Sequence, residues 1–319
     1  MGSIRSIEIE NDGHLRIGAA ELADNAAPES IVERKAPPAD SPSPVPLWLW
    51  WNILSLDAPV VAVVWALLFS RASHMAVPTA TIAVLALVVW IIYLADRLLD
   101  GWLTTDKRTL KERHRFCNRH RVVISTLTML GALGGAWLAY HSLDDAEVKA
   151  GLLLAAVLTF YMLCVHAGGP AVSHLFPKEL AVGALFAAGT ALPVWSHSHA
   201  FSWDGLYSWL LFALACVLNC VAIQCWEDEI DVREPAGAQS RFVSWSKSRI
   251  PVVATGTALL GIAGLWFLRS DSNAIAAAGT AALLILLLNS VRTRLSAHAL
   301  RVLADAALLI PAVFALLVR

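Results

Sequence analysis

Residues 77–101 read VPTATIAVLALVVWIIYLADRLLDG, a long apolar run that closes with two aspartates, Asp96 and Asp100. About 20 apolar residues in helical form span the hydrocarbon core of a bilayer, so the run predicts a transmembrane helix. Side chains at positions i and i+4 lie on the same face of a helix. The two carboxyl groups are therefore expected together at the helix end, and acids placed in a membrane segment are functional candidates by default.

The composition also indicates a membrane protein. Of the 319 residues, 57% are hydrophobic and 15% are charged, and the mean hydropathy is +0.62. Soluble domains contain roughly 45–50% apolar and about 25% charged residues. A formal net charge of -1 leaves no dominant basic surface for nucleic-acid phosphates. We expect a polytopic membrane protein that binds lipid and no nucleic acid.

The amino-terminal part of the chain has a different character. Residues 1–45 lack a continuous apolar run, and residues 36–46 read APPADSPSPVP, a proline- and serine-rich tract that cannot bury a core. We expect residues 1–45 to form a disordered cytoplasmic leader and residues 46–319 to form one transmembrane domain.

Apolar runs of bilayer length recur along the rest of the chain and predict an all-α bundle of nine transmembrane helices. Short polar connections separate the runs, which favours antiparallel helical hairpins and excludes a barrel of short alternating strands. The predicted spans cover residues 47–70, 77–99, 121–141, 148–166, 179–196, 207–226, 250–268, 274–290 and 299–318.

A second acidic cluster closes the sixth predicted span, where residues 225–231 read CWEDEID. Basic residues concentrate after the second and sixth spans, most densely from Lys107 to Arg121. Cytoplasmic loops are the ones enriched in Lys and Arg. This bias predicts a cytoplasmic amino terminus, a carboxyl terminus on the opposite side, and both acidic clusters at the cytoplasmic mouth.

Carboxylates gathered at one mouth of a membrane protein repel one another unless a cation neutralises them. Mg²⁺ takes oxygen ligands, keeps some of its water, and is commonly bound by one or two carboxylates together with substrate phosphates. An acid at a single helix end is usually only an interfacial charge. Two clusters at one depth favour a magnesium site that holds a diphosphate between two helices.

These residues resemble the UbiA-type intramembrane prenyltransferases, a family of nine transmembrane helices with two aspartate-rich motifs on cytoplasmic loops. The first family motif is roughly N-x-x-x-D-x-x-x-D, and the chain has Ile92, Asp96 and Asp100 at its positions. The second is roughly D-x-x-x-D in an acidic run, where the chain begins with Glu227 and ends with Asp231. The chain thus departs from the family at the asparagine and at the leading aspartate. Weaker likenesses are Leu56-Asp57-Ala58-Pro59 and Pro177-Lys178-Glu179-Leu180.

The resemblance implies a Mg²⁺-dependent enzyme that ionises an allylic prenyl diphosphate and transfers the prenyl group to a lipophilic acceptor of unknown identity. It implies that the catalytic carboxylates are Asp96, Asp100, Asp228 and Asp231, with Glu227 as a further metal ligand. The cations expected near the diphosphate are Arg97, Lys178, Arg233 and Lys247.

Other functions fit parts of the same pattern. A UbiA-like terpene cyclase would use the same ionisation step, and loss of the motif asparagine at Ile92 supports a non-catalytic protein that retains the fold. A transporter would use intramembrane acids as an ion route. Asp57 and Asp305 lie within apolar runs, each followed by a proline. They are equally suited to a functional role and to capping backbone amides that the proline frees.

Overall fold

The computed structural model describes residues 54–103, 120–167, 177–197, 202–230, 241–268 and 272–318. Every secondary-structure element in these ranges is helical, which agrees with the predicted all-α class. The elements are α2 (Asp57–Ala72), α3 (Thr79–Leu103), α5 (Arg121–Ser142), α6 (Asp145–Ala167), α8 (Lys178–Trp195), α9 (Trp203–Ile230), α10 (Arg241–Lys247), α11 (Ile250–Phe267), α12 (Ser272–Val291), the 3₁₀ turn η1 (Arg292–Arg294) and α13 (Ala297–Leu317).

Seven of the described helices are long and apolar enough to cross a membrane, namely α3, α5, α6, α9, α11, α12 and α13. A multi-pass membrane protein follows from these seven. The predicted first span coincides in part with α2, which has 16 residues, and the predicted fifth span coincides with α8, which has 18. Lys178 and Glu179 in the first turn make α8 less apolar than the others. The count of nine spans stays a prediction.

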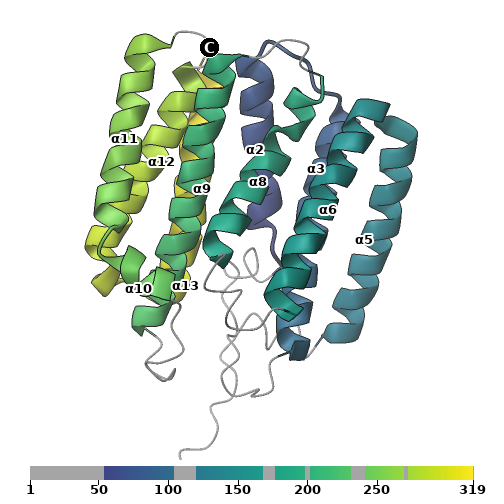
Figure 1. The fold of residues 1–319 in the computed structure, drawn as a ribbon, viewed down its shortest axis with the longest axis horizontal. Helices are drawn as coiled ribbons and strands as arrows, with labels where there is room; N and C mark the ends of the chain where they lie inside the picture. The colour runs from purple at the N-terminus through teal and green to yellow at the C-terminus, as the bar shows by residue number, and fades with distance from the viewer. Residues whose placement is uncertain are drawn as a thin grey trace, which may run out of the picture. The chain divides into compact units, whose positions relative to one another are not determined.

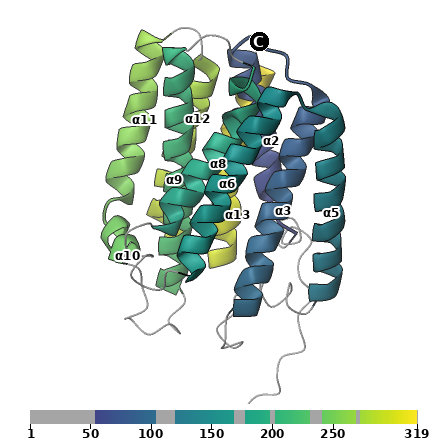
Figure 2. The same ribbon diagram turned by 45° about the vertical axis from the view of Figure 1, so that its right-hand side comes forward.

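The long helices alternate in direction along the chain (Figure 1). The consecutive helices α8 and α9, α11 and α12, and α12 and α13 pack side by side, as the turned view also shows (Figure 2). The name motif end is used for the end of the bundle at which α3 and α9 finish. The first acidic cluster lies in the last turns of α3, and the second lies at the end of α9. The opposite end, where α3 and α9 begin, is the far end. Helix α10 is a short additional element at the motif end that the sequence did not predict.

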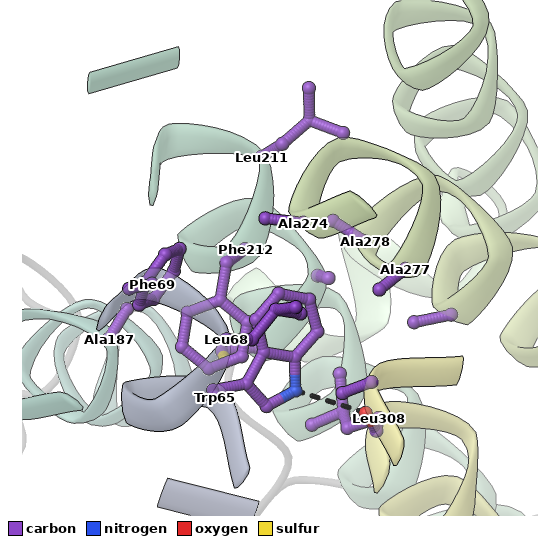
Figure 3. Packing of buried hydrophobic residues seen from close by; sticks show 14 of the residues in the cluster. Trp65, Leu68, Phe69, Ala187, Leu211, Phe212, Ala274, Ala277, Ala278 and Leu308 are labelled. Atoms are coloured by element: carbon purple, nitrogen blue, oxygen red, sulfur yellow. Dashed lines mark hydrogen bonds between the residues drawn. The ribbon is translucent and has the colours of Figure 1, made fainter. Parts of the chain in front are cut away.

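The centre of the bundle is an aromatic and alanine core shared by α2, α8, α9, α12 and α13 (Figure 3). Trp65 on α2 is fully buried and stacks on Phe212 of α9 with ring centroids 4.1 Å apart. Alanines such as Ala274 and Ala278 let α12 approach these rings closely. Small residues are the usual means of close helix packing in lipid, where apolar burial alone does not favour association.

The first and last described helices lie next to each other and run in the same direction. The Trp65 indole N–H donates to the carbonyl oxygen of Leu308 on α13 at 3.0 Å (Figure 3). Further along the same two helices, Arg71 of α2 donates to the carbonyl oxygens of Leu316 and Val318 at 2.6 and 2.7 Å. Arg71 thereby satisfies carbonyl groups that the end of α13 cannot pair within the helix.

Helices α5 and α6 follow each other closely in the chain and lie at one edge of the bundle, where α5 packs on α3 and α6 packs on α8 (Figure 1). Their large side chains, for example Tyr140, Leu153 and Phe160, are mostly exposed. A lipid-facing position explains this exposure, because a bilayer solvates apolar side chains as well as a protein core does.

Helices α8 and α9 approach each other closely at Gly183. A Cβ atom added at Gly183 would lie 2.7 Å from the backbone nitrogen and Cα of Val217. A side chain larger than that of glycine would therefore force the two helices apart.

We predict that Gly183→Ala separates α8 from α9 and lowers the melting temperature in detergent by roughly 2–10 °C, since overpacking costs about 1–3 kcal/mol. Gly256→Ala is the matched control, because a Cβ there meets no atom within 4 Å among the described residues. The control should be neutral or slightly stabilising. Equal melting temperatures for the two variants would contradict this packing.

Candidate active site

The first acidic motif lies in the last turns of α3, and the structure brings it to the start of α8. Lys178 Nζ lies 3.2 Å from Asp96 Oδ1 in a half-exposed ion pair. Two residues predicted to share one site, a metal ligand and a diphosphate-binding cation, are therefore in contact. Asp100 belongs to α3, but its side chain lies outside the described part. Ile92 occupies the position of the family asparagine, one turn before Asp96 and half-buried.

The second acidic motif ends α9, and its acids take separate partners. Glu227 Oε1 accepts from Arg301 Nη1 at 2.8 Å, and this pair is the less exposed one, at 11% and 21%. Asp228 Oδ1 accepts from Gln224 Nε2 at 2.7 Å, one turn earlier on the same helix.

Glu229, which the sequence did not single out, binds two cations. Arg292 Nε and Lys247 Nζ lie 2.8 and 2.9 Å from its two carboxylate oxygens. Lys247 was predicted to hold diphosphate, and here it joins the short helix α10 to the end of α9. Asp231 and Arg233 lie outside the described residues.

Arg97, predicted to approach the diphosphate, is buried with 6% of its surface exposed. It lies close enough to Asp305 on α13 to interact with that carboxyl electrostatically. Arg97 is more buried than Asp96, whose side chain is 33% exposed. A buried guanidinium needs acidic partners, because an unpaired charge in an apolar interior is very costly.

The fit of a metal at the motif end depends on which carboxylates are available. In the described ranges, a metal-sized group of three acidic or histidine side chains occurs at one place, and it is the far end. At the motif end, Glu227 is already neutralised by Arg301, so it fits a metal less well than the aspartates do. Asp96 and Asp228 have only partly shielded carboxylates and remain suitable oxygen ligands.

The far-end group consists of Asp144, Glu147 and His197. Asp144 Oδ1 accepts from the Glu147 backbone N–H at 2.8 Å, and Glu147 Oε2 accepts from the Asp144 backbone N–H at 3.1 Å, which is a capping box that starts α6. His197 Nε2 lies 3.1 Å from Asp144 Oδ2, and the Thr81 hydroxyl donates to the buried Glu147 at 2.9 Å. These contacts hold α3, α6 and the end of α8 together. This structural role is enough to explain why the three side chains lie close to one another.

A polar cluster lies inside the bundle, inward from the acidic motifs. Asn219 Nδ2 donates to Asp305 Oδ1 at 3.2 Å, and the carboxyl groups of Asp305 and Asp57 are hydrogen-bonded to each other. Tyr93 on α3 lies within electrostatic range of both acids. The apolar surroundings of Asp57 and Asp305 signalled these acids in the sequence, but no local pattern signalled Asn219 as their partner.

Comparison with protein-family models, with curated proteins and with solved structures found no match to this chain.

We predict that Arg301→Met, which leaves Glu227 buried without its cation, destabilises the protein by about 3 kcal/mol. The double variant Glu227→Gln/Arg301→Met should recover much of this loss, because no charge is then left unpaired. Chemical denaturation in detergent measures both. Arg294→Met is the control, an exposed cation of η1 at the same end, and it should change little. Additive effects of the two single changes would contradict the coupling.

Acid should loosen the far end. The pKa of Asp144 lies below its ordinary value, first because the Glu147 N–H donates to the carboxylate and also because His197 lies nearby. A depressed pKa stabilises the fold above the unfolded pKa, about 3.9, and that stabilisation disappears as the pH falls through the folded pKa.

We therefore expect the melting temperature of the wild type to fall more steeply between about pH 5 and pH 3 than that of Asp144→Asn. Asparagine is chosen because it preserves the helix cap. Asp145→Asn, one residue further on, should retain the wild-type slope. Identical slopes in all three proteins would rule out this contribution.

Proposed function

We propose that this protein is a Mg²⁺-dependent membrane prenyltransferase that ionises an allylic prenyl diphosphate and transfers the prenyl group to a lipophilic acceptor. The observation that carries the proposal is the contact between Asp96 and Lys178 at the end of the bundle where the second acidic motif also finishes. A carboxylate and an ammonium group held together in this way are the two kinds of group that bind a metal diphosphate.

Cations at different depths in the bundle would bind the diphosphate together. Lys178, which pairs with Asp96, would bind a diphosphate oxygen, and Lys247 would bind the diphosphate from α10. Arg97, directly after Asp96, would attract the diphosphate from inside the bundle. Each of these cations stabilises the negative charge that develops on the leaving group.

Asp96, Asp100, Asp228 and Asp231 would hold Mg²⁺, and the contact with Arg301 argues against Glu227 as a ligand. Bound there, Mg²⁺ supplies a Lewis acid that lowers the energy of the departing diphosphate. The resemblance of the two acidic motifs to the UbiA-type prenyltransferases supports this assignment.

The allylic cation needs a dry and unreactive environment further inside. Tyr93 and Phe186 form an edge-on aromatic pair with ring centroids 6.5 Å apart, and Phe186 approaches Phe212 at 6.3 Å. Aromatic faces attract cations without reacting as strong bases. These rings lie between α3, α8 and α9, inward from Asp96, where the prenyl chain would begin.

The topology belongs to the same proposal. We infer nine membrane-crossing helices, with α2 and α8 added to the seven that satisfy length and hydropathy. Among the described cations, most belong to the motif end, whereas Arg71 and Lys149 belong to the far end. The positive-inside bias then makes the motif end cytoplasmic, with the amino terminus inside and the carboxyl terminus outside.

We predict that a non-hydrolysable farnesyl diphosphate analogue binds the purified protein in detergent only when Mg²⁺ is present. Asp96→Ala and Asp228→Ala should each weaken this binding at least about tenfold, the effect of losing one charged ligand contact. Asp145→Ala removes an exposed acid at the far end and should bind like the wild type.

Binding that is indifferent to Mg²⁺ and to both substitutions would refute the enzymatic proposal and favour a transporter or a non-catalytic membrane protein. With cleavable farnesyl diphosphate, product analysis then separates prenyl transfer from cyclisation of the prenyl chain, as in a terpene cyclase.

A further inference from the structure

The carboxyl groups of Asp57 and Asp305 meet inside the bundle although they belong to its first and last described helices. Helices α2 and α13 run side by side, since Trp65 contacts Leu308 and Arg71 contacts Leu316 along the same two helices. Asp57 lies in the first turn of α2, and its side chain reaches Asp305 in the middle of α13.

A hydrogen bond between two carboxyl groups requires that one of them carries a proton, because ionised carboxylates have only acceptors. Asp57 and Asp305 make such a bond. The pair therefore holds one proton and one negative charge. The protonated member donates to its partner, and the ionised member keeps lone pairs that can accept a second proton.

Asn219 adds an acceptor that has no donor. Its Nδ2 donates to Asp305, whereas its Oδ1 is buried and accepts no hydrogen bond from the part of the chain that the structure describes. The residue is 6% exposed. Buried carbonyl oxygens are nearly always hydrogen-bonded in folded proteins, so this atom indicates that an O–H or N–H donor beyond the described residues completes the cluster.

The charged and titratable groups around the pair come from several helices. Arg97 and Tyr93 face it from α3, and Cys216 and Cys220 lie near it on α9. Lys178 and Glu179 of α8 are within electrostatic range of Cys220. On α13 itself, Arg301 is engaged by Glu227. Of these cations, Arg97 is the one that interacts electrostatically with Asp305 and would balance the single negative charge of the pair.

The depth of the cluster matches the position of a reacting carbon. Asp305 follows Arg301 by four residues, or roughly 6 Å along a helix, and Arg301 contacts the second acidic motif. In a prenyl diphosphate bound head-first at the motif end, the carbon that loses diphosphate lies just inward from the head. An acceptor that attacks this carbon must bring its nucleophilic atom to the same level.

We propose that Asp57, Asp305 and Asn219 bind the hydroxyl group of the lipophilic acceptor, and that the ionised carboxylate of the pair takes its proton. The hydroxyl donates to the carboxylate or to Asn219 Oδ1. This assignment of the acceptor rests on the proposed function, whereas the preference of the cluster for a hydroxyl donor does not.

Prenyl transfer breaks one bond to the allylic carbon and forms another. The bond between the allylic carbon and the diphosphate oxygen breaks, and the electron pair leaves with the diphosphate. The acceptor oxygen forms the new bond to the allylic carbon, and the electron pair of its O–H bond stays on oxygen. The proton moves to the ionised carboxylate, so that both acids of the pair are then neutral.

A matched pair of probes tests the binding part without any knowledge of the natural acceptor. 2-Naphthol offers a hydroxyl donor on an apolar ring system, and 2-methoxynaphthalene is the same ring system with the donor removed. We expect the wild type in detergent to bind 2-naphthol at least about tenfold more tightly, because a buried acceptor is left unpaired by the methoxy compound.

The double variant Asp57→Asn/Asp305→Asn should lose most of this preference, because its two amides cannot take the proton and Asn219 Oδ1 is then the acceptor that is left. Asp204→Asn, an acid in the first turn of α9 at the far end, should keep it. Infrared spectra recorded in H₂O and D₂O add a second readout. The band of a protonated carboxylic acid should be present in the wild type and reduced in Asp305→Asn.

The outcomes separate the two proposals. Equal affinity of the wild type for both probes, or a preference that survives in the double variant, overturns the hydroxyl site. If the double variant does not fold, loss of the infrared band in Asp305→Asn alone decides whether the pair holds a proton. Failure of Mg²⁺-dependent binding of the farnesyl analogue, with the hydroxyl preference intact, overturns the prenyltransferase and leaves the site.

Discussion

Neutralisation of carboxylates inside an apolar bundle is the constraint on which the arrangement of the motif end depends. An acid in this setting must meet a cation, a hydrogen-bond donor or a proton, because an unpaired charge is too costly to keep. The described residues show the first two. Arg301 meets Glu227, Gln224 donates to Asp228, and Asn219 donates to Asp305. Each partner lies on a defined helix, so the pairing also fixes how the helices are arranged.

Much of the fold could be predicted from the sequence, because lipid imposes a length and an apolar character on every crossing helix. The run at 77–99 corresponds to α3, and the run at 250–268 corresponds closely to α11. Helix α2 begins later than the predicted span at 47–70, at Asp57, after Ser55 adopts a positive φ of 55°. Helix α10 has only 7 residues, too few for a pattern based on bilayer thickness to find it.

The candidate site was predictable only as a set of residue types at one end of the bundle. The sequence predicted Asp96 and Lys178 for one region, and the two side chains are in contact, since alternation of helices brings the end of α3 to the start of α8. It could not assign Arg301 to Glu227 or Asn219 to Asp305. Those partners are 74 and 86 residues apart in the chain, and their contact depends on which helices pack together, a property that no local spacing contains.

The parallel pairing of α2 with α13 has a consequence for how the protein is made. Translation produces α2 before α13, so Asp57 and the Trp65 indole are made long before their partners Asp305 and Leu308 exist. During synthesis these polar groups must be sheltered by other helices or by the insertion machinery. This part of the interior can close only after α13 has been made.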